Sequence, residues 1–357
     1  MLKILDIYIG KTIVATTSLV LGTLVGLSAI IKYVEQIKGV GIGTYDLLTA
    51  LQFVLLSIPR DIELFFPMAV LLGALIGLGT LASSSELVVM QAAGYSKLNI
   101  GVSVLKTAIP LMLVVLGLGQ WGAPDAQKAA RELRAFAQSG GSVKSIRHGV
   151  WAKDGKDFIY MAKTDQQRTL IGVNIWKFAD QQALKTHIFA EKANFLEGGK
   201  WRLQDVTVTD FANNEAITKR SLDDFVWQTT LTPEKLSVVE VKPEEMSLSG
   251  VADYVSYLKE SEQDASRYEL ALWRKVLQPL TIAVMMLLAL SFVFGPLRSV
   301  TMGARVLSGV LFGFAFYISN EVFGPMILVY QFPAFIGAAA PSLLFVLITL
   351  YLLRRKL

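Results

Sequence analysis

The chain of 357 residues contains no cysteine, and charged residues make up only 18% of it. The lack of cysteine excludes a secreted scaffold built on disulfides. An average soluble domain is about one-quarter charged, and an apolar share of 53% excludes a disordered chain. The apolar residues are concentrated in long uncharged runs near both ends of the chain. This distribution favours a membrane protein over a cytosolic enzyme.

The sequence also lacks the residue patterns of catalysis. Its two histidines, His148 and His187, have no partners at the spacing of metal ligands, so surface or strand histidines are the favoured interpretation. No Gly-x-Ser-x-Gly elbow is present. Gly10-Lys11-Thr12 resembles the end of a phosphate-binding loop, but Leu5 stands where that loop needs a glycine. We therefore expect no catalytic residue, no metal site and no cofactor bound by this chain.

The uncharged runs predict six membrane-spanning helices. A bilayer core about 30 Å thick requires about 20 apolar residues in a helix. The last run is too long for one span and is interrupted at Gln331-Phe332-Pro333, so we predict two spans there, at 305–328 and 333–353. The five uncharged runs are 13–31, 64–85, 107–124, 276–297 and 322–353.

Lysine and arginine predict the orientation of these spans, because cytoplasmic loops carry an excess of both. They gather on one side, which we expect to be cytoplasmic together with both termini. Residues 123–270 then lie outside. The first run is long and has no small-residue cleavage site, so it is expected to be a retained span. The basic residues on the cytoplasmic side are Lys3, Lys11, Lys97, Arg298, Arg354, Arg355 and Lys356.

The predicted fold is an α-helical membrane protein with six spans, three before and three after an inserted all-β periplasmic domain. We assign residues 1–122 to the first three spans, 123–248 to a β domain with a helical lead-in, and 249–357 to a second lead-in and the last three spans. The β domain is expected to be a sandwich or jelly roll over about 140–245. Its large aromatic residues are core by default.

Short stretches rich in β-branched and aromatic residues predict the strands. Asp154-Gly155 and Gly198-Gly199 are hairpin signals. Helices are expected at 126–138, continuing the third span, and at 249–275, with Ser249 as its cap. The predicted strands are 149–153, 158–162, 169–178, 184–190, 201–209 and 225–230.

The loop between spans two and three predicts a short cytoplasmic helix over about 84–94. Ser83 and Glu86 fit a capping box, and Gly94 can end the helix in a left-handed conformation. Apolar side chains at Leu87, Val88 and Met90 allow two interpretations of equal weight. The helix either lies in the lipid interface or docks into another protein.

Glycines spaced four apart mark plausible helix contacts, because small residues let helices approach closely. A homodimer and a contact with a related subunit are equally compatible with them. The pairs are Gly22 with Gly26, Gly73 with Gly77, and Gly309 with Gly313.

Several segments resemble the LptF/LptG (YjgP/YjgQ) permeases of the lipopolysaccharide export machine. The segment 86–94, Glu-Leu-Val-Val-Met-Gln-Ala-Ala-Gly, resembles their coupling helix. The resemblance covers essentially the whole chain, including its layout, and is closer to the LptG branch than to the LptF branch. The other matching segments are 9–12, 58–61, 66–69, 290–298 and 323–325.

The resemblance implies a permease subunit of an ABC-type exporter in the bacterial inner membrane. Its expected partners are an LptF-like permease as heterodimer, two copies of the LptB ATPase and an LptC-like single-span jelly-roll protein. The substrate would be lipopolysaccharide, taken from the outer leaflet and passed to a line of jelly rolls. ATP and magnesium would be bound by the ATPase, and nucleic acid is not an expected partner.

Basic residues near the outer surface are candidates for binding lipopolysaccharide phosphates, because the family lines its entry site with such residues. Arg131 and Arg134 share one helix face. Headgroup anchoring is the alternative for each residue, and Asp61 beside Arg60 argues for a local ion pair. The candidates are Lys32, Lys38, Arg60, Arg131 and Arg134.

Apolar residues of the spans are candidates for contact with acyl chains, with lipid-facing or packing roles as the alternative. Energy coupling to the ATPase is assigned to Glu86, Leu87, Val88 and Met90. The acyl-chain candidates are Phe65, Phe66, Met68, Phe316, Tyr317 and Phe323.

Other classes of protein remain as alternatives. A secondary transporter normally carries ionisable residues deep in its spans, where Glu321 is the main candidate. A membrane-anchored periplasmic scaffold without transport activity needs neither six spans nor a capped cytoplasmic helix. A net charge of +5 fits contact with anionic lipid, although the cytoplasmic excess of lysine and arginine alone can produce it.

Overall fold

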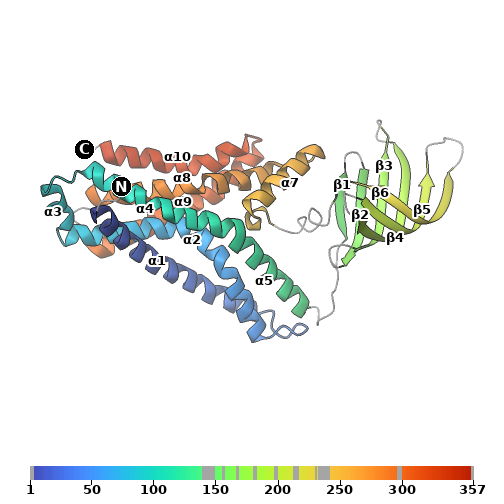
Figure 1. Cartoon of the computed structure of the whole chain (residues 1–357), viewed down its shortest axis with the longest axis horizontal. Helices are drawn as coiled ribbons and strands as arrows, with labels where there is room; N and C mark the ends of the chain where they lie inside the picture. The colour runs from blue at the N-terminus through green and yellow to red at the C-terminus, as the bar shows by residue number, and fades with distance from the viewer. Residues whose placement is uncertain are drawn as a thin grey trace.

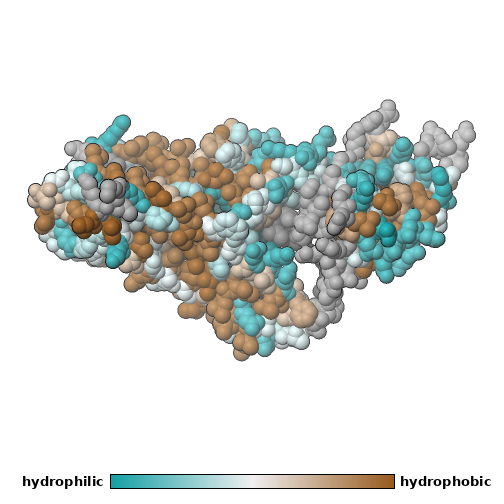
Figure 2. All heavy atoms as spheres, in the orientation of Figure 1, coloured by the Kyte–Doolittle hydropathy of each residue, from teal (hydrophilic) through white to brown (hydrophobic). Residues whose placement is uncertain are grey.

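The computed structural model describes residues 4–138, 149–154, 157–165, 169–179, 183–196, 200–211, 217–229, 231, 242–295 and 300–354. Six helices in this part of the chain are long and apolar enough to cross a membrane. A separate antiparallel sheet of six strands lies beyond one end of the helices (Figure 1). Apolar residues cover most of the visible helical surface, and polar residues gather towards the sheet (Figure 2).

The first half of the chain supplies three spans and a helix that extends beyond the third. The short helix α3 lies at the end of the molecule far from the sheet, as do both termini (Figure 1). The third span passes through a π-helical turn and continues into α5, which confirms the predicted helical continuation to Gln138. The elements are α1 (Ile4–Ile37), α2 (Leu47–Ser83), α3 (Glu86–Ala92), α4 (Lys97–Gly117), the π-helical turn η1 (Leu118–Gly122) and α5 (Ala123–Gln138).

The second half contains α7 (Leu248–Glu260) and three further spans. The prediction of one helix over 249–275 was wrong, because the chain breaks between α7 and α8 where Glu262 adopts a positive φ of 51°. Ser247, and not Ser249, caps α7 by accepting a hydrogen bond from Gly250 N–H. The two predicted spans at the end of the chain are confirmed. The spans are α8 (Ser266–Phe294), α9 (Met302–Val329) and α10 (Ala334–Arg354), and a 3₁₀ turn (Pro243–Glu245) precedes α7.

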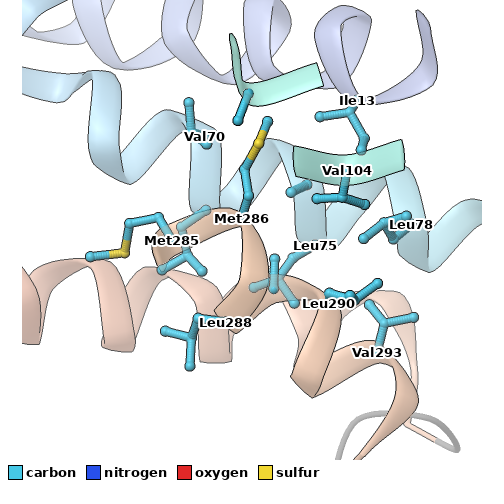
Figure 3. Close-up of a cluster of buried hydrophobic side chains, with 14 of the residues drawn as sticks. Ile13, Val70, Leu75, Leu78, Val104, Met285, Met286, Leu288, Leu290 and Val293 are labelled. Atoms are coloured by element: carbon cyan, nitrogen blue, oxygen red, sulfur yellow. The ribbon is translucent and has the colours of Figure 1, made fainter. Parts of the chain in front are cut away.

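The membrane core centres on α2 and α8, the two spans with the largest buried share. Figure 3 shows side chains from α1, α2, α4 and α8 meeting in one cluster, among them Ile13, Leu75, Val104 and Met286. Lipid offers no hydrophobic driving force for the association of helices. The close packing of these apolar side chains therefore holds the four helices together.

The glycines of α2 bring α1 very close. A Cβ added at Gly73 would lie 2.4 Å from the Cα atom of Thr17, and the Thr16 hydroxyl donates to the Gly73 carbonyl at 2.7 Å. Gly77 faces Thr16 in the same contact. Gly22 and Gly26 have nothing within 4 Å, so their spacing does not mark a contact within this chain.

The six strands form a meander in which each strand pairs with the next in sequence. Asp154 pairs with Asp157, and Leu196 pairs with Lys200, so the strands on either side of each predicted hairpin signal are antiparallel neighbours. The glycines of both signals lie outside the described residues. Five predicted strands lie within or near the observed ones, but the last begins at Thr218 and not at Phe225. Within the described residues the strands make one sheet, not the two packed sheets of a sandwich. The strands are β1 (Val150–Asp154), β2 (Asp157–Asp165), β3 (Thr169–Phe178), β4 (Leu184–Leu196), β5 (Lys200–Asp210) and β6 (Thr218–Gln228).

One face of the sheet carries the buried residues, such as Ile159, Ile175 and Trp201, which share a core with residues of α7. The Tyr257 hydroxyl of α7 donates to the Lys153 carbonyl of β1 at 2.8 Å. The sheet is therefore attached to the helix that leads into the fourth span.

Candidate functional site

The predicted capping box at the start of α3 was wrong. Helix α2 continues to Ser83, and α3 starts after Ser85, which has a φ of 63° and makes no side-chain cap. The Glu86 carboxylate instead accepts hydrogen bonds from the Tyr8 hydroxyl at 2.7 Å and the Ser84 hydroxyl at 2.8 Å. Glu86 is thus attached to α1, a contact between residues 78 positions apart.

These hydrogen bonds favour the charged form of Glu86. The Tyr8 hydroxyl, followed by that of Ser84, lowers the pKa of the Glu86 carboxyl below its usual value. A carboxylate at the N-terminus of a helix is also favoured by the helix dipole. Glu86 therefore presents a negative charge at the far end of the helical region.

The two faces of α3 have different environments. Leu87 and Met90 are buried in the core of the spans, whereas Val88 and Val89 are 53% and 66% exposed. Of the three apolar residues predicted to dock into a partner, only Val88 lies on the open face, and Val89 joins it. Gly94 ends the helix with a φ of 87°, as predicted.

Lys32 and Arg60 each form an ion pair with a carboxylate of α2. Lys32 on α1 pairs with Asp61, which is almost fully buried and also accepts from Ser28 at 3.1 Å. Arg60 pairs with Glu63 at 3.1 Å. The carboxylates neutralise both cations locally, so an anion must compete for them.

The remaining basic candidates lie on α5 and after α1. Arg131 pairs with Glu245 at 3.2 Å, whereas the Arg134 guanidinium lies 5.7 Å from the centre of the Phe53 ring. Lys38 is exposed. Three of the five predicted phosphate ligands, Lys32, Arg60 and Arg131, are therefore already paired with carboxylates.

Lys275, which sequence reasoning missed, completes the cluster of Arg60 and Glu63. Lys275 of α8 pairs with Glu63 at 2.8 Å, with 11% and 6% of the two side chains exposed. Both residues stand next to long uncharged runs, and that position was the available signal. Their partnership joins residues 212 positions apart and had no local signature.

A cavity of about 140 Å³ with a mixed charged and apolar lining lies beside this cluster, between α2, α8, α9 and α10. Arg60, Glu63, Arg274 and Lys275 line one part of it, and Phe316 lines another. A cavity with charged walls and an aromatic side can hold water or a small polar group, but it is far smaller than a lipid.

The apolar candidates divide between packing and open positions. Phe66 is 3% and Phe316 7% exposed, and Phe316 contacts Phe345 edge-on at 5.2 Å, so both pack within the chain. Tyr317 is 36% exposed. Phe65, Met68 and Phe323 are half-buried.

His187 lies on the sheet, stacked on Trp176 with ring centres 5.3 Å apart, and its Nε2 is 3.1 Å from the Asn174 amide oxygen. Burial lowers the pKa of its imidazole. His148 lies outside the described residues. No group of three or more histidine, aspartate or glutamate residues in the described ranges is arranged to hold a metal ion.

Comparison with known proteins identifies the family. The family described as lipopolysaccharide export system permease LptF/LptG matches residues 7–355. The chain belongs to the LptF/LptG family. It is 50% identical over 354 residues to the lipopolysaccharide export system permease protein LptG of Escherichia coli K12, covering 99% of this chain and 98% of that one. It is also 50% identical over 357 residues to LptG of Haemophilus influenzae, covering 100% and 99%.

Membership in the LptF/LptG family accounts for the layout of the chain. The six spans and the inserted β-sheet are those of a multi-pass permease.

Proposed function

We propose that this chain is an LptG-type permease subunit of an ABC-type exporter, which takes lipopolysaccharide from the outer leaflet of the inner membrane and passes it to periplasmic β domains. The observation that carries the proposal is 50% identity to LptG permeases over nearly the full length of both chains. The LptF-type subunit is the alternative, and the same identity favours LptG.

The chain is proposed to lie in the inner membrane with both termini in the cytoplasm and residues 123–270 in the periplasm. Two features support this orientation. Both termini and α3 lie at the end far from the sheet (Figure 1), and Lys11, Lys97 and Arg354 belong to that same end of the spans.

Energy is proposed to come from an ATPase partner, which would hold ATP and magnesium. The open face of α3 suits docking, because it combines exposed Val88 and Val89 with the charged carboxylate of Glu86. Two copies of an LptB-type ATPase would serve a pair of permeases, and an LptC-like protein would extend the line of β domains.

A heterodimer with an LptF-like permease is supported by the open faces of α1 and α9. These two spans flank α2 and have only 22% and 17% of their span windows buried. Leu19 on α1 and Leu311 on α9 are 70% and 60% exposed. Two such surfaces suit a cavity shared with a second subunit, where acyl chains would meet apolar walls.

Lipopolysaccharide phosphates are proposed to bind first at Lys38 and Arg134. Lys38 is exposed, and Arg134 lies over an aromatic ring, so its guanidinium keeps donors for a phosphate. Lys32 and Arg60 would contribute by exchanging a carboxylate for a phosphate. Arg131 would first have to leave Glu245.

Co-purification tests the proposal. The tagged chain is co-expressed with an LptF-type permease and an LptB-type ATPase, extracted in mild detergent and reconstituted with lipopolysaccharide. We expect all three proteins to be recovered together and ATP to drive release of the lipid. Photocrosslinkers at positions 38 and 134 should capture lipopolysaccharide, and a crosslinker at the exposed position 351 provides the matched control.

Substitutions at Glu86 then test the role of α3. Glu86→Lys should weaken recovery of the ATPase, because it reverses the charge on the docking face. Glu86→Gln should retain more of it, since the amide removes the negative charge without placing a positive charge on the docking face. If the folded chain is recovered without ATPase under all conditions, a scaffold or a secondary transporter becomes the better explanation.

A further inference from the structure

The cytoplasmic end of α1 contacts the residues at both ends of α3. At the start of α3, the Tyr8 hydroxyl donates to Glu86 at 2.7 Å. Beyond its end, the Tyr95 hydroxyl donates to the Asp6 carboxylate at 2.7 Å. Tyr8 and Asp6 are two residues apart on α1, so one turn of that helix holds both ends of a seven-residue helix.

The Asp6 contact is a buried network and not a surface hydrogen bond. Asp6 is only 3% exposed. Its carboxylate also accepts from the Ser103 hydroxyl and pairs with Lys106 at 2.7 Å, both on α4. Hydrogen bonds to a buried charge are among the stronger polar contacts in proteins.

Tyr95 connects this network to the backbone of α3. The Tyr95 backbone N–H donates to the Met90 carbonyl at 2.9 Å. This hydrogen bond caps the C-terminus of α3, just after Gly94. Burial raises the pKa of the Tyr95 hydroxyl, so it remains a donor. Tyr95 therefore connects the end of α3 directly to Asp6 of α1, so a shift of α3 displaces the partner of Asp6.

Apolar packing reinforces the same connection. Leu87 and Met90, on the inner face of α3, belong to the same core cluster as Ile9 and Ile13 of α1. Ile9 and Ile13 are fully buried. The polar contacts bind the two ends of α3 to α1, and Leu87 and Met90 bury its inner face in the core to which α1 also contributes.

We propose that Asp6, Tyr8 and Tyr95 form a clamp that makes α3 and α1 move as one unit, so that α1 carries motion of the ATPase to the substrate side of the membrane. The chain connects α3 directly to α2 and α4, so a role for α1 does not follow from connectivity. The helix α1 has 34 residues and is about 50 Å long. Its outer part carries Lys32, a candidate phosphate ligand.

Spin labels test the clamp in the purified chain without any partner. The chain has no cysteine, so single cysteines can be introduced cleanly. A label at Val89, which is 66% exposed, reports the motion of α3. We expect the label to become more mobile in Asp6→Asn and in a Tyr8→Phe/Tyr95→Phe double variant, but not in Tyr351→Phe, which changes an exposed tyrosine of α10. Equal mobility in all of these proteins would overturn the clamp.

Pairs of labels test transmission, which rests on the proposed function because an ATPase must bind α3. In the assembled complex, the distance between labels at Val89 and Leu19 of α1 should stay constant when ATP is added. The distance between Val89 and Leu350 of α10 should change. Equal changes in both distances would overturn the proposal. Failure of the wild-type chain to bind the ATPase would overturn the proposed function and leave the mobility result standing.

The transport readout separates a positioning role from a folding role. The clamp variants should still recover the ATPase, but the lipid released per ATP hydrolysed should fall about fivefold or more, the scale of typical coupling between sites. A loss of assembled complex with an unchanged ratio would show that these residues only support folding. Asp6→Glu should release more lipid per ATP hydrolysed than Asp6→Asn. It keeps the negative charge that faces the Tyr95, Ser103 and Lys106 donors.

Discussion

Gly73 provides the sharpest stability prediction, because no side chain fits at that position. A Cβ atom there would lie 2.3 Å from the Thr17 Oγ1 atom, 2.4 Å from its Cα atom and 2.6 Å from its backbone nitrogen. Two of these atoms belong to the backbone, so a change of rotamer cannot relieve the clash. In Gly73→Ala, α1 and α2 must separate.

The size of the effect follows from the required movement. Carbon atoms in contact are normally about 3.5–4.0 Å apart, so the helices must separate by roughly 1 Å. Overpacking of this kind costs about 1–3 kcal/mol, and loss of the hydrogen bond from Thr16 to the Gly73 carbonyl adds about 1 kcal/mol. The higher helix propensity of alanine returns about 1 kcal/mol. We expect a net loss of about 1–3 kcal/mol.

Thermal unfolding in detergent, followed by tryptophan fluorescence, measures this loss. The midpoint should fall by on the order of 5 °C for Gly73→Ala. The matched control is Gly26→Ala in α1, where an added Cβ meets nothing within 4 Å and the midpoint should not fall. If the two variants unfold at the same temperature, the close contact of α1 with α2 at Gly73 does not contribute to the stability of the chain.

Three further predictions concern ionisable groups. Lys275→Met should destabilise the chain by about 3 kcal/mol in thermal unfolding, because it leaves the buried Glu63 carboxylate with Arg60 alone, and adding Glu63→Leu should recover part of the loss. Lys32→Gln should also destabilise the chain, because it leaves the buried Asp61 carboxylate without its cation. Binding of lipopolysaccharide should therefore be compared between the double variant Lys32→Gln/Asp61→Asn and the single variant Asp61→Asn. Equal crosslinking to lipopolysaccharide in these two variants would show that Lys32 does not bind phosphate. Burial lowers the pKa of His187 in the folded chain. As the pH decreases below about 6.5, the unfolded chain therefore binds more protons than the folded chain, and the free energy of unfolding decreases. His187→Gln should show a shallower fall on acidification, and an unchanged slope would contradict the assignment.

The sequence predicted those elements whose residues follow a pattern along the chain. The third strand runs over Thr169–Phe178 as expected, since apolar and β-branched residues mark it throughout. The last strand was predicted too short, because residues from Thr218 to Asp224 are exposed and carry no apolar alternation. That segment is held in the sheet by its pairing with β5, and its local sequence does not predict a strand.

The candidate site was less predictable, because its contacts join distant segments. Ser83 and Glu86 have the spacing of a capping box, yet Glu86 binds Tyr8 instead. Lys32 was identified as a functional cation from its place at the end of an apolar run, but that pattern could not show that Asp61 neutralises it. Local sequence reports which residue types stand at the membrane surface, whereas the partner of each is decided by packing.

The ion pairs also bear on how transport is driven, because they lie at the boundaries of the apolar layer. On α2, the residues from Leu64 to Ser83 are uncharged, and 20 residues of helix cover about 30 Å, the thickness of the bilayer core. The pairs Lys32–Asp61 and Lys275–Glu63 stand at the edge of such segments nearer the sheet, and Asp6–Lys106 stands near the opposite edge. An ion-driven transporter needs ionisable groups through the depth of its spans to relay charge. This placement of the described ion pairs fits the proposed exporter, in which an ATPase outside the membrane would move the helices.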